Sequence, residues 1–142
     1  MSRGERNDTQ SWLPRAGARD PSLPWPAVVL AGERPGGNAL AREHQLPASV
    51  LVPVGGKACL ARVITTLRAS HNVDGGLLVG PSPDIVKDND VLRELLAIGD
   101  FRWLEPMRGP SASALRAASA LGKYPLLLTT GAEAVENAVK IA

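Results

Sequence analysis

The sequence has one cysteine, few aromatic residues and only a small excess of positive over negative charge. Cys59 is the only cysteine among 142 residues, which excludes a disulfide framework and a zinc site built on cysteines. Aromatic residues make up 4%, so aliphatic side chains and alanine must fill any core. The formal net charge of +2 at pH 7 is too small to indicate nucleic-acid or membrane binding.

The chain also lacks a long apolar run. No stretch approaches the roughly 20 apolar residues that a membrane-spanning helix needs, and the N-terminal residues lack the apolar core of a signal peptide. We therefore expect a cytoplasmic protein. Hydrophobic residues at 44% and charged residues at 21% are ordinary for a globular domain and exclude a wholly disordered chain.

Composition divides the chain into three parts. Residues 1–25 contain few large apolar side chains, too few to offset the entropy of ordering, so we expect a disordered tail. Residues 26–130 have the apolar patterning of a domain. Residues 131–142 show the apolar spacing of a C-terminal helix.

Strand-like and helix-like segments alternate within the domain. Short apolar runs predict strands at residues 27–31, 76–80, 101–104 and 125–129. The run 50–54 predicts at best an edge or irregular strand, because Pro53 cannot donate to a ladder. Apolar residues at helical spacing predict a helix that starts near Ala58, and further helices at residues 92–98 and 115–121.

This alternation predicts an α/β fold in which a mostly parallel sheet carries helices on both faces. The apolar runs 27–31 and 76–80 are expected to be buried on both faces of such a sheet. Ligands of these folds bind beyond the carboxyl ends of the strands. The long loop after the first predicted strand therefore lies where a ligand is expected to bind.

A glycine-rich loop follows the first predicted strand. Gly32, Gly36 and Gly37 lie on either side of Arg34, and successive backbone amides in such a loop can face an anion. Arg34 can add a bidentate contact to a phosphate. The residues alone allow a flexible turn with a solvated arginine equally well.

Two segments together resemble the opening of the NTP-transferase family, which includes the molybdenum-cofactor nucleotidyltransferases. Residues 27–34 read Ala-Val-Val-Leu-Ala-Gly-Glu-Arg, and residues 51–63 read Leu-Val-Pro-Val-Gly-Gly-Lys-Ala-Cys-Leu-Ala-Arg-Val. The segment 109–113, Gly-Pro-Ser-Ala-Ser, resembles the family's later nucleotide-side loop. The resemblance covers residues 26–130.

The resemblance implies a Rossmann-like, glycosyltransferase-A-type sheet that binds a nucleoside triphosphate with Mg²⁺. The implied reaction transfers a nucleoside monophosphate to a small phosphorylated acceptor and releases pyrophosphate, which requires mostly positioning and charge neutralisation. The family's nucleotide-binding positions correspond to Ala31, Gly32, Glu33, Arg34, Lys57, Ser111 and Ser113. Arg34 is the implied catalytic residue on the phosphates, and the two serines are implied near the base or ribose. Lys57 either supports the loop or contacts the ligand.

Two departures from the family pattern leave the activity open. The family places a phosphate-binding lysine before its second apolar run, where residues 47–50 read Pro-Ala-Ser-Val. The family's metal-binding aspartate corresponds to Ala132, and the neighbouring Glu133 points elsewhere because it is shifted by one residue. No metal ligand is therefore assigned. The alternatives are a non-catalytic nucleotide-binding module and a truncated or fused fragment without independent activity.

The last 13 residues, 130–142, resemble a different family, the class III pyridoxal-phosphate aminotransferases. In that family, Gly-Ala amides at a helix N-terminus hold the cofactor phosphate. The segment is too short to make the chain an aminotransferase. The NTP-transferase family continues with an acceptor-binding half beyond this point, so we expect a C-terminally truncated domain whose last helix is of uncertain origin.

Overall fold

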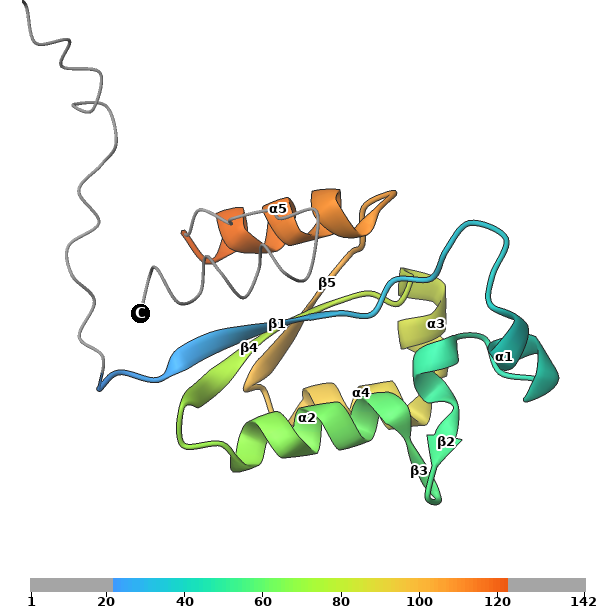
Figure 1. The fold of residues 1–142 in the computed structure, drawn as a ribbon, viewed down its shortest axis with the longest axis horizontal. Helices are drawn as coiled ribbons and strands as arrows, with labels where there is room; N and C mark the ends of the chain where they lie inside the picture. Colours follow the sequence, from blue (N-terminus) through green and yellow to red (C-terminus); the bar gives the residue numbers. More distant parts are fainter. Residues whose placement is uncertain (1–21, 123–142) are drawn as a thin grey trace, which may run out of the picture.

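A three-stranded parallel sheet lies at the centre of the part of the chain that the computed structural model describes, residues 22–122 (Figure 1). Its strand order is β1-β4-β5, with β1 at Trp25–Leu30, β4 at Val73–Val79 and β5 at Phe101–Leu104. Pairing in register brings Leu30 beside Val79 and Val79 beside Leu104. All three strands therefore end at one edge of the sheet.

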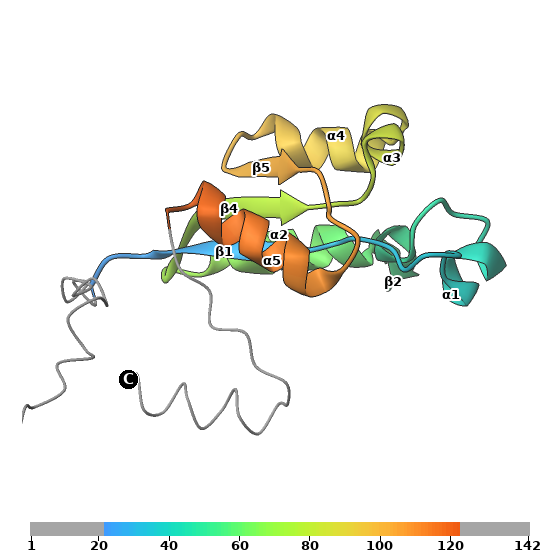
Figure 2. The same cartoon turned by 90° about the horizontal axis from the view of Figure 1, so that it is seen from above.

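Helices cover both faces of this sheet, as the alternating sequence pattern predicts. Figure 1 shows α5 (Pro110–Ala120) above the sheet and α2 (Cys59–Ala69) and α4 (Asp90–Ala97) below it. Figure 2 shows α5 running along β1 and β4. A small hairpin of β2 (Pro53–Val54) and β3 (Lys57–Ala58) precedes α2.

Two clusters of buried side chains form the core. The larger cluster lies between the sheet and α2 and α4, and it consists of Ala31, Ala48, Leu51, Leu60, Ile64, Leu78, Leu92 and Phe101. The smaller cluster lies under α5, where Ala117 contacts Leu77 and Val79. Neighbouring side chains of β4 therefore enter opposite clusters, which is the alternation expected of a central strand.

The main elements confirm the sequence prediction, with different boundaries. β1 begins at Trp25 rather than residue 27, and β4 begins at Val73 rather than residue 76. The three helices expected in residues 58–121 are α2, α4 and α5. The predicted tail up to residue 21, the strand at 125–129 and the helix at 131–142 lie outside the described residues.

One expectation is corrected, and the structure adds detail in two segments. β4 is buried at its end, but Val28 and Leu30 of β1 are 40% and 44% exposed, so burial on both faces does not hold for β1. The run 50–54, expected to be at best an edge or irregular strand, is divided between the 3-10 helix η1 (Ser49–Leu51) and the two-residue strand β2. Two short helices, α1 (Ala39–Glu43) and α3 (Pro83–Asp88), occupy segments for which no helix is predicted above.

Within residues 22–122, every helix is too short or too polar to cross a bilayer.

Candidate functional site

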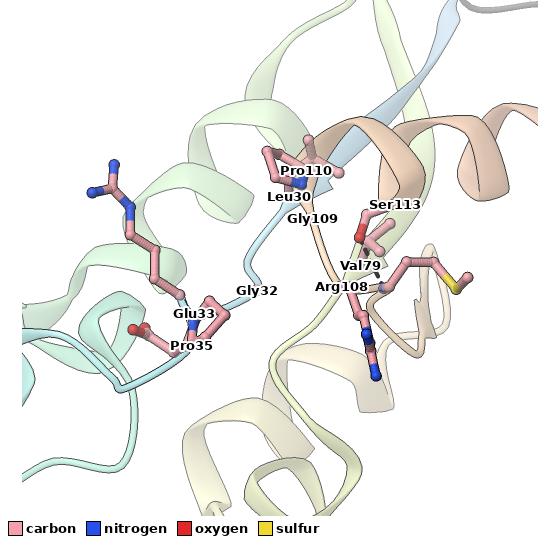
Figure 3. A pocket seen from close by; sticks show the side chains of 11 residues that line it. Leu30, Gly32, Glu33, Pro35, Val79, Arg108, Gly109, Pro110 and Ser113 are labelled. Atoms are coloured by element: carbon pink, nitrogen blue, oxygen red, sulfur yellow. Dashed lines mark hydrogen bonds between the residues drawn. The ribbon is translucent and has the colours of Figure 1, made fainter.

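A cavity of about 250 Å³ opens at the carboxyl edge of the sheet. Three segments form its walls: the end of β1 with the following loop through Pro35, the end of β4 at Val79, and the β5–α5 connection with the start of α5. Figure 3 shows Glu33 and Pro35 on one side of Gly32, and Arg108 and Ser113 on the other. The cavity thus lies where parallel sheets bind their ligands.

Close backbone packing beyond the strand ends holds these segments together. The amide of Ala31 donates to the carbonyl of Val79 at 2.8 Å, and the amide of Gly80 donates to the carbonyl of Leu104 at 2.9 Å. A Cβ atom at Gly80 would lie 2.7 Å from the nitrogen of Gly32. Gly80 also has φ +92°, a backbone conformation that favours glycine. This glycine therefore lets the first loop approach the end of β4.

The side chain of Glu33 is used to hold the loop. Its Oε1 accepts hydrogen bonds of 2.6 Å from the backbone nitrogen and from the Oγ of Ser49, at the start of η1. Further along the loop, Gly37 N donates to Arg34 O at 2.9 Å, and the Arg42 guanidinium donates to Gly36 O at 3.0 Å. The loop is therefore an ordered turn that carries an exposed Arg34.

The N-terminus of α5 forms the opposite wall. Gly109 is the N-cap and provides no side-chain hydrogen bond, and the first turn contains no acidic residue. The first backbone bond of the helix runs from Ser113 N to Gly109 O at 3.0 Å. The amides of Ser111 and Ala112 precede this bond, at the positive end of the helix dipole. This wall favours a negatively charged ligand.

Arg108 and Ser113 complete this wall. Ser113 is 5% exposed, and its Oγ accepts a hydrogen bond of 2.9 Å from the amide of Met107 (Figure 3). Arg108 is exposed, and its guanidinium has no ion-pair partner in the described part of the chain. The same is true of Arg34 within residues 22–122. Two arginines that have no ion-pair partner among the described residues therefore line one cavity.

Four of the residues expected to bind nucleotide line this cavity: Gly32, Glu33, Arg34 and Ser113. The other three do not line it. The side chain of Ala31 is buried in the larger core cluster, although its backbone leads into the loop. Ser111 is exposed at the first turn of α5.

Lys57 lies at a different surface. It lines a groove of about 360 Å³ between α2 and α4, together with Ala61 and Glu94. We refer to this surface as the α2–α4 groove. The β2–β3 hairpin holds Lys57 there, because Arg62 of α2 donates to the carbonyl of Gly55 at 2.9 Å.

Sequence reasoning missed Met107 and Arg108, which both line the cavity. The only available signal was their position directly before the Gly-Pro-Ser-Ala-Ser segment at 109–113. Arg108 follows a predicted strand and precedes a glycine, a context similar to that of Arg34. Applying the Arg34 argument to every strand end would have identified Arg108.

The described residues that line the cavity offer one carboxylate to a magnesium ion, that of Glu33. Its Oε1 already accepts two hydrogen bonds from Ser49. Residues 22–122 contain no group of three or more His, Cys, Asp or Glu side chains able to hold a metal ion. Protein-bound Mg²⁺ is usually held by one or two carboxylates together with substrate phosphates.

No family model, no curated protein and no solved structure matches this chain.

Proposed function

We propose that this chain is a nucleotide-binding domain that holds the phosphates of a nucleoside triphosphate in the cavity at the carboxyl edge of its sheet. One observation carries the proposal: Arg34 and Arg108 come from different loops, line one cavity and have no carboxylate partner within residues 22–122. Unpaired cations gathered at one cavity favour an anionic ligand.

Phosphate suits this arrangement better than a single carboxylate does. Guanidinium groups form charge-assisted, often bidentate hydrogen bonds with phosphate oxygens. The N-terminus of α5 adds backbone amides and a positive dipole end, which also favour phosphate. Because the arginines come from two separate loops, a ligand with several phosphates can engage both.

The cavity is large enough for only part of a nucleotide. Its volume of about 250 Å³ lies below the roughly 300–1,000 Å³ of pockets that enclose a drug-sized ligand. We therefore place the phosphates inside and the nucleoside at the mouth. Leu30 and Pro110 line the cavity, and Leu30 is 44% exposed, so an apolar surface is available there for the sugar or base.

The fold also agrees with a nucleotide-binding domain, and it suggests a specific type of sheet. We propose that the sheet is of the Rossmann-like, glycosyltransferase-A type, because its strands are parallel, its helices cover both faces and its cavity lies at the carboxyl edge. Among the possible nucleotide ligands, the resemblance of residues 27–34 and 51–63 to the NTP-transferase family favours a nucleoside triphosphate.

Nucleotidyl transfer is the second candidate function, and the same paired segments favour it. The chain would transfer a nucleoside monophosphate to a phosphorylated acceptor, with Arg34 stabilising charge on the reacting phosphates. We place binding first because the sequence lacks the family's phosphate-binding lysine and metal-binding aspartate. The described lining residues also offer a single carboxylate, which is already bonded to Ser49.

Calorimetric titration of the full chain with ATP, GTP, CTP and UTP tests the binding proposal, once with Mg²⁺ and once with a chelator. We expect one or more of the four to bind under both conditions. Arg34→Ala and Arg108→Ala should each weaken binding about tenfold or more, because each removes charge-assisted hydrogen bonds. The matched control is Arg102→Ala on β5, an exposed arginine outside the cavity, which should leave affinity unchanged.

Absence of binding by all four triphosphates would overturn the proposal, as would an equal loss in all three arginine variants. A pyrophosphate assay then separates the two candidate functions. Steady release that Arg34→Ala abolishes supports the transferase, and binding without release supports the module. A fragment without independent activity would show neither binding nor a cooperative melt.

A further inference from the structure

We propose that Ser113 is the positioning residue of the cavity, holding Arg108 where its guanidinium meets the phosphates. The proposal rests on the function proposed above and assigns the device that orients one of its two arginines. Arg108 lies on a connection between β5 and α5 that has no regular secondary structure, so something other than a helix or sheet must hold it.

Ser113 holds this connection at two points, one on each side of Arg108. Its Oγ accepts a hydrogen bond of 2.9 Å from the amide of Met107. Its own amide donates to the carbonyl of Gly109 at 3.0 Å. The residues before and after Arg108 are therefore tied to the same serine, which limits the positions that the Arg108 backbone can take.

The hydroxyl of Ser113 makes a different kind of hydrogen bond from the hydroxyls of Thr65 and Thr66 in α2. Thr65 and Thr66 of α2 donate to carbonyls one turn earlier, at 2.7 Å and 2.9 Å. That local bond is common for Ser and Thr in helices. Ser113 instead receives a backbone amide from outside its helix, and it is the buried polar side chain of the described residues, at 5% exposure. The buried hydroxyl thus fixes the neighbouring part of the cavity wall at Met107.

Fixing Arg108 has a direct effect on affinity. A long side chain loses conformational entropy when a ligand immobilises it, and a mobile backbone would add to that loss. Since Met107, Arg108 and Gly109 all line the cavity, an unfixed connection would also change the shape of the wall. Ser113 thus reduces the entropy lost on binding and keeps the shape of the wall before the ligand arrives.

A double-mutant cycle on the full chain tests the proposal, with calorimetry of inorganic tripolyphosphate and of the nucleoside triphosphate that binds best. Ser113→Ala should weaken binding about tenfold when Arg108 is present, the effect of losing one well-placed hydrogen bond with its ordering. In the Arg108→Ala background, Ser113→Ala should weaken binding by less than about twofold. Ser119→Ala is the matched control on the same helix, and it should leave affinity unchanged, since Ser119 is exposed and outside the cavity.

Two results would overturn the proposal while leaving the binding function intact. One is wild-type affinity in Ser113→Ala. The other is an equal loss with and without Arg108, which would mean that Ser113 contacts the ligand itself. Failure of the wild-type chain to bind either probe would remove the proposed function and this inference together.

A second pair of variants keeps the test valid if Ser113→Ala does not melt cooperatively. Threonine and valine have nearly the same shape, and only threonine carries a hydroxyl. Ser113→Thr should retain tripolyphosphate affinity within about threefold, and Ser113→Val should lose about tenfold. Equal affinities of the two variants would contradict the proposal.

Discussion

Glu33 and Ser49, 16 residues apart in the sequence, are joined by two hydrogen bonds of 2.6 Å. One carboxylate oxygen accepts both the amide and the hydroxyl of the serine. The bonds connect the loop after β1, which lines the cavity, to the start of η1, whose Leu51 is buried in the larger core cluster. The loop that carries Arg34 is therefore anchored to the hydrophobic core through a single side chain.

Glu33→Ala should lower the free energy of unfolding by about 1–3 kcal/mol, because it leaves two donors of Ser49 without their charged acceptor. Urea unfolding measures the change. Glu105→Ala is the control: Glu105 is exposed beyond β5 and has no bond to another described residue, so about 0.5 kcal/mol or less is expected. Equal stabilities of the two variants would show that the Glu33–Ser49 contact does not anchor the loop.

Lys57→Ala should leave triphosphate affinity unchanged within about twofold, because Lys57 lies in the α2–α4 groove rather than in the cavity. Calorimetry at physiological salt, where distant charges are screened, measures the effect. The positive control is Arg34→Ala. A loss with Lys57→Ala as large as that with Arg34→Ala would place Lys57 on the ligand, as the family resemblance allows.

The ion pair of Asp100 with Arg68 is expected to make the domain less stable at acid pH than at neutral pH. Its carboxylate oxygens accept two hydrogen bonds from the Arg68 guanidinium, at 2.7 Å and 2.6 Å. These bonds and the positive charge of Arg68 lower the pKa of Asp100 below its usual range, although burial acts in the opposite direction. Since the folded-state pKa is the lower one, this stabilisation is present above the unfolded-state pKa of about 3.9 and is lost as pH falls toward the folded-state value.

Asp100→Asn should therefore lower stability at pH 7 by about 1–2 kcal/mol and flatten its decline below about pH 4. Thermal melts from pH 7 to pH 3 measure both effects. Asp90→Asn is the surface control, because the Asp90–Arg93 side chains are 82% and 63% exposed while those of Asp100 and Arg68 are 30% and 20% exposed. Parallel pH profiles of the Asp100 variant and the wild type would contradict the prediction.

Gly80→Ala should destabilise the domain by more than about 2 kcal/mol, because the added Cβ would lie 2.7 Å from Gly32 N at a positive φ. Gly109→Ala provides the comparison. Its Cβ would meet no atom within 4 Å, and its φ of −148° suits any residue. Thermal melts of both variants measure the difference, and a Gly80→Ala protein as stable as the wild type would show that the loop after β1 does not need this close approach.

The sequence predicted the elements that have clear periodicity. Leu60 and Ile64 are buried on α2 as the helical spacing requires, although Val63 is 40% exposed. The short helices were missed for a local reason: α1 and α3 have only 5 and 6 residues, too few to show a helical period. The run 50–54 is only partly strand, as Pro53 indicated, and its apolar residues lie in different surroundings: Leu51 is buried in the core and Val54 is 53% exposed in a hairpin.

Some residues of the candidate site were also predictable from local sequence, and others were not. Glycine and arginine directly after a strand identified Gly32 and Arg34 as cavity residues, because strand ends in a parallel sheet share one edge. Lys57 was grouped with them by motif spacing alone. The hairpin that precedes α2 instead directs this lysine toward the α2–α4 groove.

Sequence alone thus determined the alternating elements and the loop that carries Arg34, since periodicity and turn residues are local properties. Only the tertiary structure decided that Arg34 and Arg108 share a cavity, that Glu33 is bound to Ser49 and that Lys57 lies elsewhere. The physical reason is that these relationships depend on the order and register of β1, β4 and β5. Pairing between distant strands is set by the packing of the whole sheet and leaves no local pattern in the chain.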